Sequence, residues 1–174
     1  MRPFIQFSSR NIQKSNEYYL SFHVKEDCFA ANFPKVAGFS KDFLFEKYKG
    51  KIPFISGLAH INNENIPIID LKLKMGMTMQ SIKNTGRIVI VETEIYSNIL
   101  KFGMFYNILG DAFEIPENKI LFTQNIDKFI ESGCVKGFHK HENSAIMILD
   151  FERILSADDL IDIMITYGSR LKKV

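Results

Sequence analysis

GLAHINNENIPIIDL, residues 57–71, is the stretch that decides the fold, because its pattern returns 80 residues further along the chain. Residues 137–151 read GFHKHENSAIMILDF and align with it without a gap. Both copies have Gly at the first position, Asn at the seventh, and Ile at the tenth and twelfth. Each then ends on an aliphatic residue, Asp, and Leu or Phe. This repeat predicts two similar subdomains, each encoded by a half-length unit.

Each copy has the pattern of a β-hairpin with a buried second strand. Positions 62–63 (Asn-Asn) and 142–143 (Glu-Asn) stand where a tight turn needs residues that tolerate positive φ. The apolar runs at 66–69 and 146–149 follow, and such runs indicate strands that are buried on both faces. The repeat therefore predicts two equivalent hairpins.

An aspartate near the end of each copy is placed to cap a short helical turn. Asp70 precedes Leu71–Met75, which Gly76 closes, and Asp150 precedes Phe151–Leu155. A capping side chain accepts a hydrogen bond from a free amide of the first turn and stabilises the helix by about 1 kcal/mol. We interpret both carboxylates as caps and not as catalytic groups.

The rest of the chain predicts further short strands. They are expected at Tyr19–Val24, Cys28–Phe33, Gly86–Glu92 and Asn98–Tyr106, whereas Asp111–Pro116 is expected to lead into a loop. Many short strands with frequent turn residues are typical of an all-β pair of barrels.

A helix is expected after these strands, at residues 157–174. Ser156 and Asp159 form a Ser-x-x-Asp start that is close to a capping box. Apolar residues then recur at helical spacing, at Leu160, Ile163, Met164, Tyr167 and Leu171. This stripe predicts an amphipathic helix that covers a sheet edge or docks on the core, and a partner-binding helix is the alternative.

The bulk composition indicates a folded protein with no strong attraction to nucleic acid or membranes. Of the 174 residues, 46% are hydrophobic, and the net charge is only +2. Residues 1–16 read as a polar, basic tail or an extra edge segment, without the apolar core of a signal peptide. Cys28 and Cys134 form no disulfide framework. We expect a cytoplasmic protein that neither binds nucleic acid nor inserts into a membrane.

No sequence motif indicates an active site or a cofactor. Phosphate-binding glycine patterns, the nucleophile elbow and the zinc helix are all absent. The alternative is a histidine-based metal site, because His139 and His141 lie two residues apart on a predicted strand and His60 stands at a related position in the first copy. Zinc needs three converging ligands, so a carboxylate such as Glu142 would have to help. We expect a protein that is not an enzyme and has no cofactor or metal.

The order of these segments resembles the CheW-like coupling proteins of bacterial chemotaxis. Phe54–Gly57, the turn and Ile66–Leu71 are similar to that family's segment F-I-x-G followed by P-[VI]-[VI]-D-L. Other segments match the family's blocks in the same order, namely Glu17–Val24, Phe29–Phe39, Arg87–Glu92, Gly103–Glu114 and Val135–Asp150.

The resemblance implies an all-β fold of two five-stranded SH3-like barrels around a shared hydrophobic core. Residues 17–156 would form this CheW-like domain of two interleaved barrel subdomains. Residues 1–16 would be an N-terminal tail, and residues 157–174 would be the C-terminal amphipathic helix.

The resemblance also implies a function. Members of the family have no active site and act as adaptors, so the expected partners are the regulatory domain of the histidine kinase CheA and the cytoplasmic tip of a methyl-accepting chemoreceptor. The positions that match the family's contact segments are Lys35, Val36, Gly38, Ile55, Gly57 and Asn62. We expect Val36→Asp to leave folding nearly intact and to weaken binding of the kinase.

Two residues depart from the family's pattern. Asn62 stands where the hairpin usually has an Arg that is tied to partner binding, and Asn107 stands where an Asp is usual. The fold tolerates both changes, because Asn suits a turn. The alternative function is therefore a divergent scaffold of another kinase pathway, such as the twitching-motility type.

Overall fold

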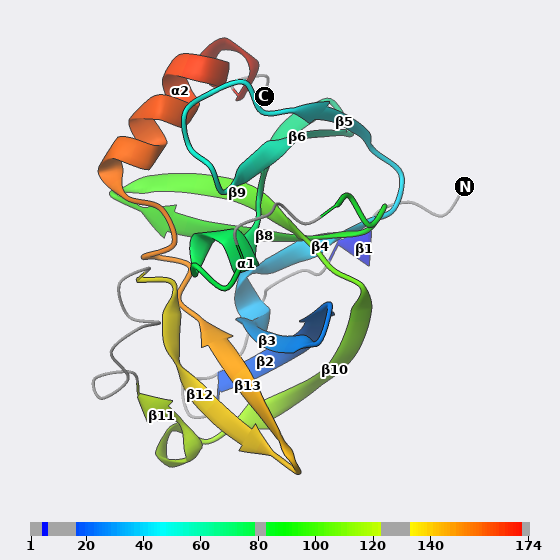
Figure 1. Cartoon of the computed structure of the whole chain (residues 1–174), viewed down its shortest axis with the longest axis vertical. Helices are drawn as coiled ribbons and strands as arrows, with labels where there is room; N and C mark the ends of the chain where they lie inside the picture. The colour runs from blue at the N-terminus through cyan, green and yellow to red at the C-terminus, as the bar shows by residue number, and fades with distance from the viewer. Residues whose placement is uncertain (1–4, 7–16, 79–82, 123–132, 172–174) are drawn as a thin grey trace.

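The strands form two curved sheets, one above the other in Figure 1, which form the upper and lower barrels. The computed structural model describes residues 5–6, 17–78, 83–122 and 133–171. In order across the upper sheet lie β1 (Ile5–Gln6), β4 (Val36–Ser40), β8 (Ile88–Ile95), β9 (Asn98–Phe105), β7 (Glu64–Ile69), β6 (Ile55–Ile61) and β5 (Leu44–Lys47). The lower sheet has β10 (Ile108–Ile115), β2 (Glu17–Val24), β3 (Asp27–Asn32), β13 (Ser144–Leu149), β12 (Val135–His141) and β11 (Leu121–Phe122).

The two sheets have the same internal order once β1 is set aside. Each has two antiparallel pairings, then one parallel pairing, β9 with β7 above and β3 with β13 below, and then two more antiparallel pairings. The β2–β3 hairpin precedes every strand of the upper sheet except β1 in sequence but pairs with β10 and β13 of the lower sheet. The chain is therefore interleaved, as expected. The sheets have seven and six strands where five each were expected, because short strands such as β1 and β11 are added at their edges.

The repeat in the sequence is a repeat in the structure. Ile55 pairs with Ile69 and Gly57 with Ile68, so one residue bulges between them. The same bulge lies in the lower hairpin, where Val135 pairs with Leu149 and Gly137 with Ile148. After each hairpin the aspartate amide donates to an equivalent carbonyl, from Asp70 to Phe54 and from Asp150 to Cys134, at 2.8 Å in both cases. The prediction of two equivalent hairpins is confirmed.

Positive φ occurs at both expected positions of the upper turn and at Glu142, but not at Asn143, of the lower turn. Asn62 and Asn63 have φ of 47° and 67°, and Glu142 has φ of 52°. Asp70 caps α1 (Leu71–Lys74) by accepting a 3.1 Å hydrogen bond from the Leu73 amide, as predicted.

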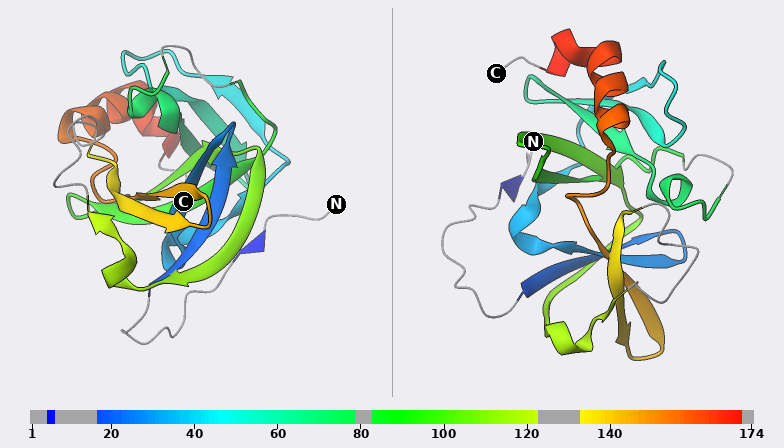
Figure 2. Two further views of the ribbon diagram at one scale, coloured as in Figure 1. Left: turned by 60° about the horizontal axis from the view of Figure 1, so that its bottom comes forward. Right: turned by 90° about the vertical axis from the view of Figure 1, so that its left-hand side faces the viewer.

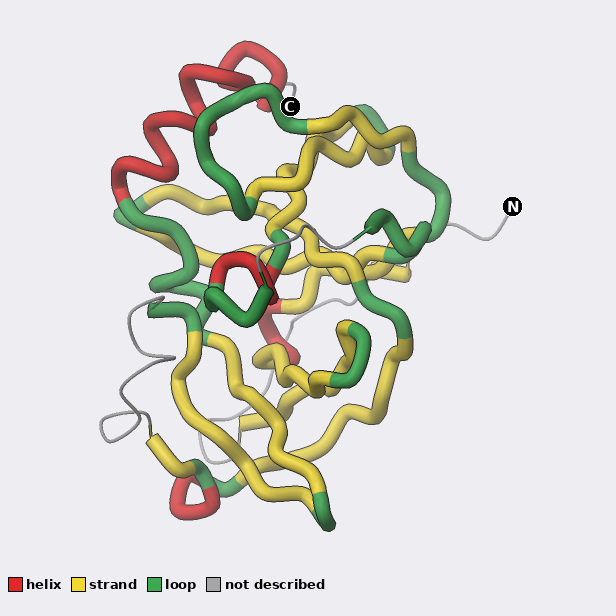
Figure 3. The backbone as a smooth tube through the Cα atoms, viewed as in Figure 1, coloured by secondary structure: helices red, strands yellow, loops and turns green. Residues whose placement is uncertain are grey.

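The second predicted helical turn, Phe151–Leu155, is wrong. Asp150 accepts from the Glu152 amide, two residues on, at 3.2 Å. A bond to that amide closes a local turn and does not start a helix. The chain therefore runs from β13 to the next helix as a loop, which is green in Figure 3.

Two other segments at sheet edges differ from simple loops or tails. Asp111–Ile115, expected to lead into a loop, is the second half of β10, and the strand ends at Pro116, where the 3-10 helix η2 (Glu117–Lys119) follows. Ile5–Gln6 pairs with Phe39 and Gly38, so this part of 1–16 is an edge strand.

A shared hydrophobic core joins the barrels. Val89 and Val91 on β8 point into this joint core, whereas Ile88 and Ile90 point into the interior of the upper barrel. The lower barrel has its own interior cluster, which includes Tyr19 and Ile148. Several strands are therefore buried on both faces, and the expected shared core is confirmed.

The C-terminal helix α2 (Ala157–Leu171) packs on β7 of the upper sheet (Figure 2). Its capping box is complete, because the Ser156 amide donates to Asp159 Oδ2 at 2.8 Å and the Asp159 amide donates to Ser156 Oγ at 3.1 Å. Ile163 and Tyr167 are buried, but Met164 is 55% exposed, so the predicted inward stripe is wrong at Met164. The side chain of Leu171 lies outside the described residues.

Candidate partner-binding surfaces

Two of the six positions expected to contact a partner lie at the surface. Lys35 is in the 3-10 helix η1 (Phe33–Lys35), where the chain passes from the lower to the upper barrel, and its Nζ lies 2.5 Å from Glu152 Oε1. Asn62 is exposed at the tip of the β6–β7 hairpin. Their contact with a partner remains a prediction.

The other four positions are buried. Val36 and Ile55, each 3% exposed, belong to the joint core. Gly38 lies between β1 and β8, and Gly57 lies between β5 and β7. The expectation that Val36→Asp leaves folding intact is contradicted by this burial. The six positions therefore do not form one accessible patch.

A hollow of about 320 Å³ lies beside Ile55. Its wall is largely aromatic and aliphatic, with polar groups from Lys47, Ser56 and Asn84. The remaining lining residues are Phe45, Tyr48, Gly50, Ile52, Pro53, Ile55 and Phe105. A hollow of this character can accept an apolar side chain of a partner.

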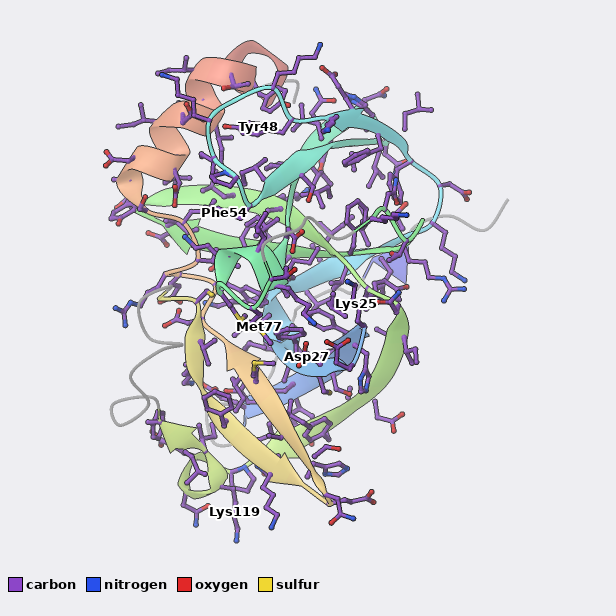
Figure 4. All side chains as sticks on the ribbon, in the orientation of Figure 1. Lys25, Asp27, Tyr48, Phe54, Met77 and Lys119 are labelled. Atoms are coloured by element: carbon purple, nitrogen blue, oxygen red, sulfur yellow. The ribbon has the colours of Figure 1, made fainter. Side chains whose placement is uncertain are left out.

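A buried lysine ties the two barrels together. Lys72 on α1 has a side chain that is 6% exposed, and its Nζ lies 2.7 Å from Glu26 and 2.5 Å from Asp27 on the β2–β3 hairpin. Figure 4 labels Lys25 and Asp27 on this hairpin and Met77, which follows α1. Burial lowers the pKa of Lys72, but the hydrogen bonds to Asp27 and Glu26 raise it more, so the net shift is upward from 10.5.

Removing the Lys72 charge is expected to weaken the junction. We expect Lys72→Met to lower the free energy of unfolding by about 1–2 kcal/mol at neutral pH, because charged hydrogen bonds contribute about that much. The pKa of Glu26 is lowered below 4.5 by its hydrogen bond to Lys72. The pKa of Lys72 is raised above 10.5. The ionic contribution of Lys72 to the free energy of unfolding is therefore full between pH 4.5 and pH 10.5. It is lost as pH falls through the lowered pKa of Glu26 or rises through the raised pKa of Lys72.

Urea unfolding of the wild type and of Lys72→Met across this pH range checks the prediction. The two curves should converge at both ends. Lys101→Met, which removes a half-exposed pair with Glu64, is the matched control and should change stability by less than about 1 kcal/mol. A constant difference at all pH values would contradict the ionic explanation.

Asn107 has a structural role that sequence reasoning did not find. Its Oδ1 accepts a 2.7 Å hydrogen bond from the Lys25 amide, and its own amide donates to the His23 carbonyl at 2.8 Å. Lys25 has φ of 56°, so Asn107 supports a left-handed turn. An aspartate could accept the same bond, which explains why this departure from the family's pattern preserves the fold.

Large apolar side chains are exposed on several strands, in one turn and on α2, and sequence reasoning did not single these out as surfaces. The exposed set is Tyr18, Leu44, Tyr96, Ile99, Ile108, Leu109, Leu121, Phe122, Ile161, Met164 and Ile165.

The three histidines of the alternative metal site do not converge. His60 lies on β6 of the upper sheet, where its ring contacts Asn65, whereas His139 and His141 lie on β12 of the lower sheet with ring centroids 6.4 Å apart. Within the described residues no three His, Cys, Asp or Glu side chains are grouped to bind a metal. The structure does not favour this alternative.

Two interleaved barrels around a joint core define a double β-barrel domain. A family model of the CheW-like domain matches residues 18–159. The chain therefore belongs to the CheW-like family, whose members are scaffolding proteins and not enzymes.

The same fold occurs among solved structures. The scaffolding protein TtCheW from Thermoanaerobacter tengcongensis superimposes with a TM-score of 0.66 at 23% identity, over 83% of this chain and 95% of that chain. No curated protein sequence matches the chain. No helix in the described ranges is long and apolar enough to cross a bilayer.

Proposed function

We propose that this protein is a cytoplasmic adaptor that couples chemoreceptors to the histidine kinase CheA. The observation that carries the proposal is that the CheW-like family model spans both barrels, from residue 18 to residue 159. We propose further that residues 17–156 act as this domain, with 1–16 as an N-terminal segment that adds the edge strand Ile5–Gln6 and 157–174 as its C-terminal helix.

The distribution of accessible groups supports a role that works by contact. An adaptor needs separate surfaces for two partners, and this molecule has Lys35 at the barrel junction and a hollow beside Ile55 in the upper barrel. Contacts of this size are individually weak, and arrays strengthen them through multivalency. We propose that the regulatory domain of CheA binds the surface around Lys35 and that the receptor tip binds elsewhere on the double barrel.

Reversing the charge of Lys35 is expected to weaken kinase binding. We expect Lys35→Glu to reduce affinity for the CheA regulatory domain by about tenfold or more, measured by titration calorimetry. Thermal unfolding should be almost unchanged, because the Lys35–Glu152 pair is partly exposed and such pairs contribute about 0–1 kcal/mol.

Glu152→Gln is the matched control for this experiment. It removes the same ion pair but leaves the lysine available, so it should bind CheA with wild-type affinity. Equal loss in both variants would mean that the ion pair, not Lys35, matters. Wild-type affinity in Lys35→Glu would remove Lys35 from the interface, and failure of the wild type to bind CheA at all would overturn the proposed function.

The twitching-motility alternative is not favoured by the comparisons. It gives a distinct result in the same assay, because a regulatory domain from another kinase pathway would then bind more tightly than that of CheA.

Asn62→Arg restores the family's usual residue at the exposed hairpin tip. If that arginine contacts the partner, this variant should bind CheA more tightly than the wild type.

A further inference from the structure

The hollow beside Ile55 lies where two hydrophobic clusters of the upper barrel meet. Phe45 and Phe105 line it with their rings in an edge-to-face contact, 5.6 Å between centroids, and both rings belong to the interior cluster of this barrel. Ile52 and Ile55 also line it and belong to the joint core. An apolar side chain that enters the hollow would therefore extend both clusters and lose its contact with water.

The loop between β5 and β6 forms one wall of the hollow, and α2 holds this loop in place. The Tyr48 hydroxyl donates to Asp162 on α2, and the Lys51 amide donates to the same carboxylate at 3.4 Å. Burial and the hydrogen bond to Asp162 raise the pKa of Tyr48 to about 12, so its hydroxyl stays a donor at neutral pH. Figure 4 labels Tyr48 on this loop. The wall is therefore preformed, and a ligand does not have to order it.

A buried hydroxyl in the wall has no hydrogen-bond partner. Ser56 lines the hollow, and its Oγ is buried without a donor or acceptor among the described residues. Buried polar atoms almost always have a partner, because leaving one unpaired costs free energy. A backbone amide or carbonyl of a bound peptide would supply the missing partner. The hollow thus combines apolar walls with one polar group that a ligand can satisfy.

Three exposed lysines alternate with residues that line the hollow. Lys47 itself lines it, and Lys49 and Lys51 each stand between two lining residues of the same loop. None of the three lies within ion-pair distance of a carboxylate in the part of the chain that the structure describes. Asp162, which contacts the Lys51 amide, accepts from the Tyr48 hydroxyl as well. The loop therefore presents positive charge that is complementary to an acidic ligand.

The chemistry of the hollow favours an acidic protein segment over nucleic acid. The three lysines lie within five positions of one loop, and the net charge of the chain is only +2. A protein that follows a phosphate backbone needs a longer basic track. The volume of about 320 Å³ is at the lower end for ligand sites, so it suits a large side chain better than a cofactor.

We propose that the hollow binds an acidic segment of a partner protein. The segment inserts one large apolar side chain toward Phe45 and Ile52 and places carboxylates against Lys47, Lys49 and Lys51. The apolar contact holds the segment in the site, and the opposite charges speed its encounter with the loop. This inference rests on the proposed function, because it assigns a ligand chemistry to one of the two surfaces proposed there for partners.

Fluorescence anisotropy with a designed peptide tests both parts of the proposal. The probe is a fluorescein-labelled peptide with one central Phe between two blocks of three Glu, and the full wild-type chain should bind it saturably. Replacing the Phe by Ser, or all the Glu by Gln, should weaken binding by about tenfold or more. No saturable binding at the highest soluble protein concentration, or equal affinity for the Ser peptide, would overturn the proposal.

Charge reversal on the protein tests whether the loop is the binding site. The triple variant Lys47→Glu, Lys49→Glu and Lys51→Glu should bind the Phe peptide about tenfold or more weakly and should unfold at the wild-type temperature, because all three side chains are exposed. The matched control reverses three exposed lysines of the lower barrel, namely Lys25, Lys119 and Lys140. Equal loss in both triple variants would mean that only net charge matters and would contradict the proposal. Tighter binding of a single-stranded oligothymidine than of the peptide would contradict it as well.

Amide chemical shifts locate the bound peptide. Titration of the nitrogen-15-labelled wild type with the Phe peptide should shift the amides of Tyr48, Ser56 and Phe105 most, and largest shifts in the lower barrel would reject the site. Calorimetry with the CheA regulatory domain separates the two proposals. A wild type that binds CheA but not the peptide rejects this inference alone, whereas one that binds the peptide but not CheA rejects the coupling to CheA and leaves the chemistry of the hollow intact.

Discussion

Val36→Asp is expected to lower the free energy of unfolding by about 4 kcal/mol or more, which is enough to unfold many domains of this size. The Val36 side chain is 3% exposed and belongs to the joint core, and its backbone pairs with Val91. An aspartate there would be a charge without a partner in the hydrophobic contact between the two barrels. Because both barrels share this core, we expect the substitution to destabilise the whole domain.

Guanidinium unfolding followed by circular dichroism measures this loss. Val36→Ala should cost less, about 1–3 kcal/mol, since it leaves a cavity but buries no charge. Lys35→Ala, one residue away on the surface, should change stability by no more than about 0.5 kcal/mol. Wild-type stability in Val36→Asp would mean that Val36 does not lie in the joint core.

Gly57→Ala is the second substitution with a large expected effect. A Cβ at Gly57 would lie 2.1 Å from the Glu46 carbonyl oxygen and 2.6 Å from the Phe45 ring. The closest atom belongs to the backbone, so strand β5 would have to move. We expect a loss of about 3 kcal/mol in the free energy of unfolding, because overpacking of this kind strains the backbone.

The repeat supplies internal controls for this prediction. Gly137→Ala should also destabilise, but less, because the nearest backbone atom, the Leu121 carbonyl oxygen, would be 2.7 Å away. Gly168→Ala in α2 meets no atom and should be neutral or stabilising by up to about 1 kcal/mol, since Ala favours a helix. Equal unfolding midpoints for Gly57→Ala and the wild type would show that β5 does not approach this closely.

These two predictions change how the binding positions are tested. A loss of CheA binding in Val36→Asp or Gly57→Ala would report unfolding and not a contact. Of the six predicted contact positions, Lys35 and Asn62 have side chains at the surface. Substitutions at these two residues therefore test partner binding without disturbing the core.

Much of the fold is encoded in local sequence. The two hairpins were predicted because turn residues at 62–63 and 142–143, a buried apolar run and a terminal aspartate all lie within fifteen positions; only the helix cap expected of Asp150 failed. The capping box at Ser156 is local in the same way. The resemblance to the CheW-like family added the interleaved arrangement, which the local patterns do not contain.

Long-range packing set the features that sequence reasoning missed. Val36 and Lys35 are adjacent in sequence, yet one is core and the other is surface, because the joint core covers only one side of that segment. Met164 fits an inward helical stripe, but the position of β7 and the contacts of Asp159 and Asp162 rotate it outward.

Residue order along the chain thus settles turns, caps and strand periodicity, because each depends on neighbours a few positions apart. Which face of a strand or helix meets water is settled by packing between segments that are distant in sequence. Strand β3 pairs with β13, more than a hundred residues later in the chain, so the lower sheet is assembled by a contact that no local pattern encodes.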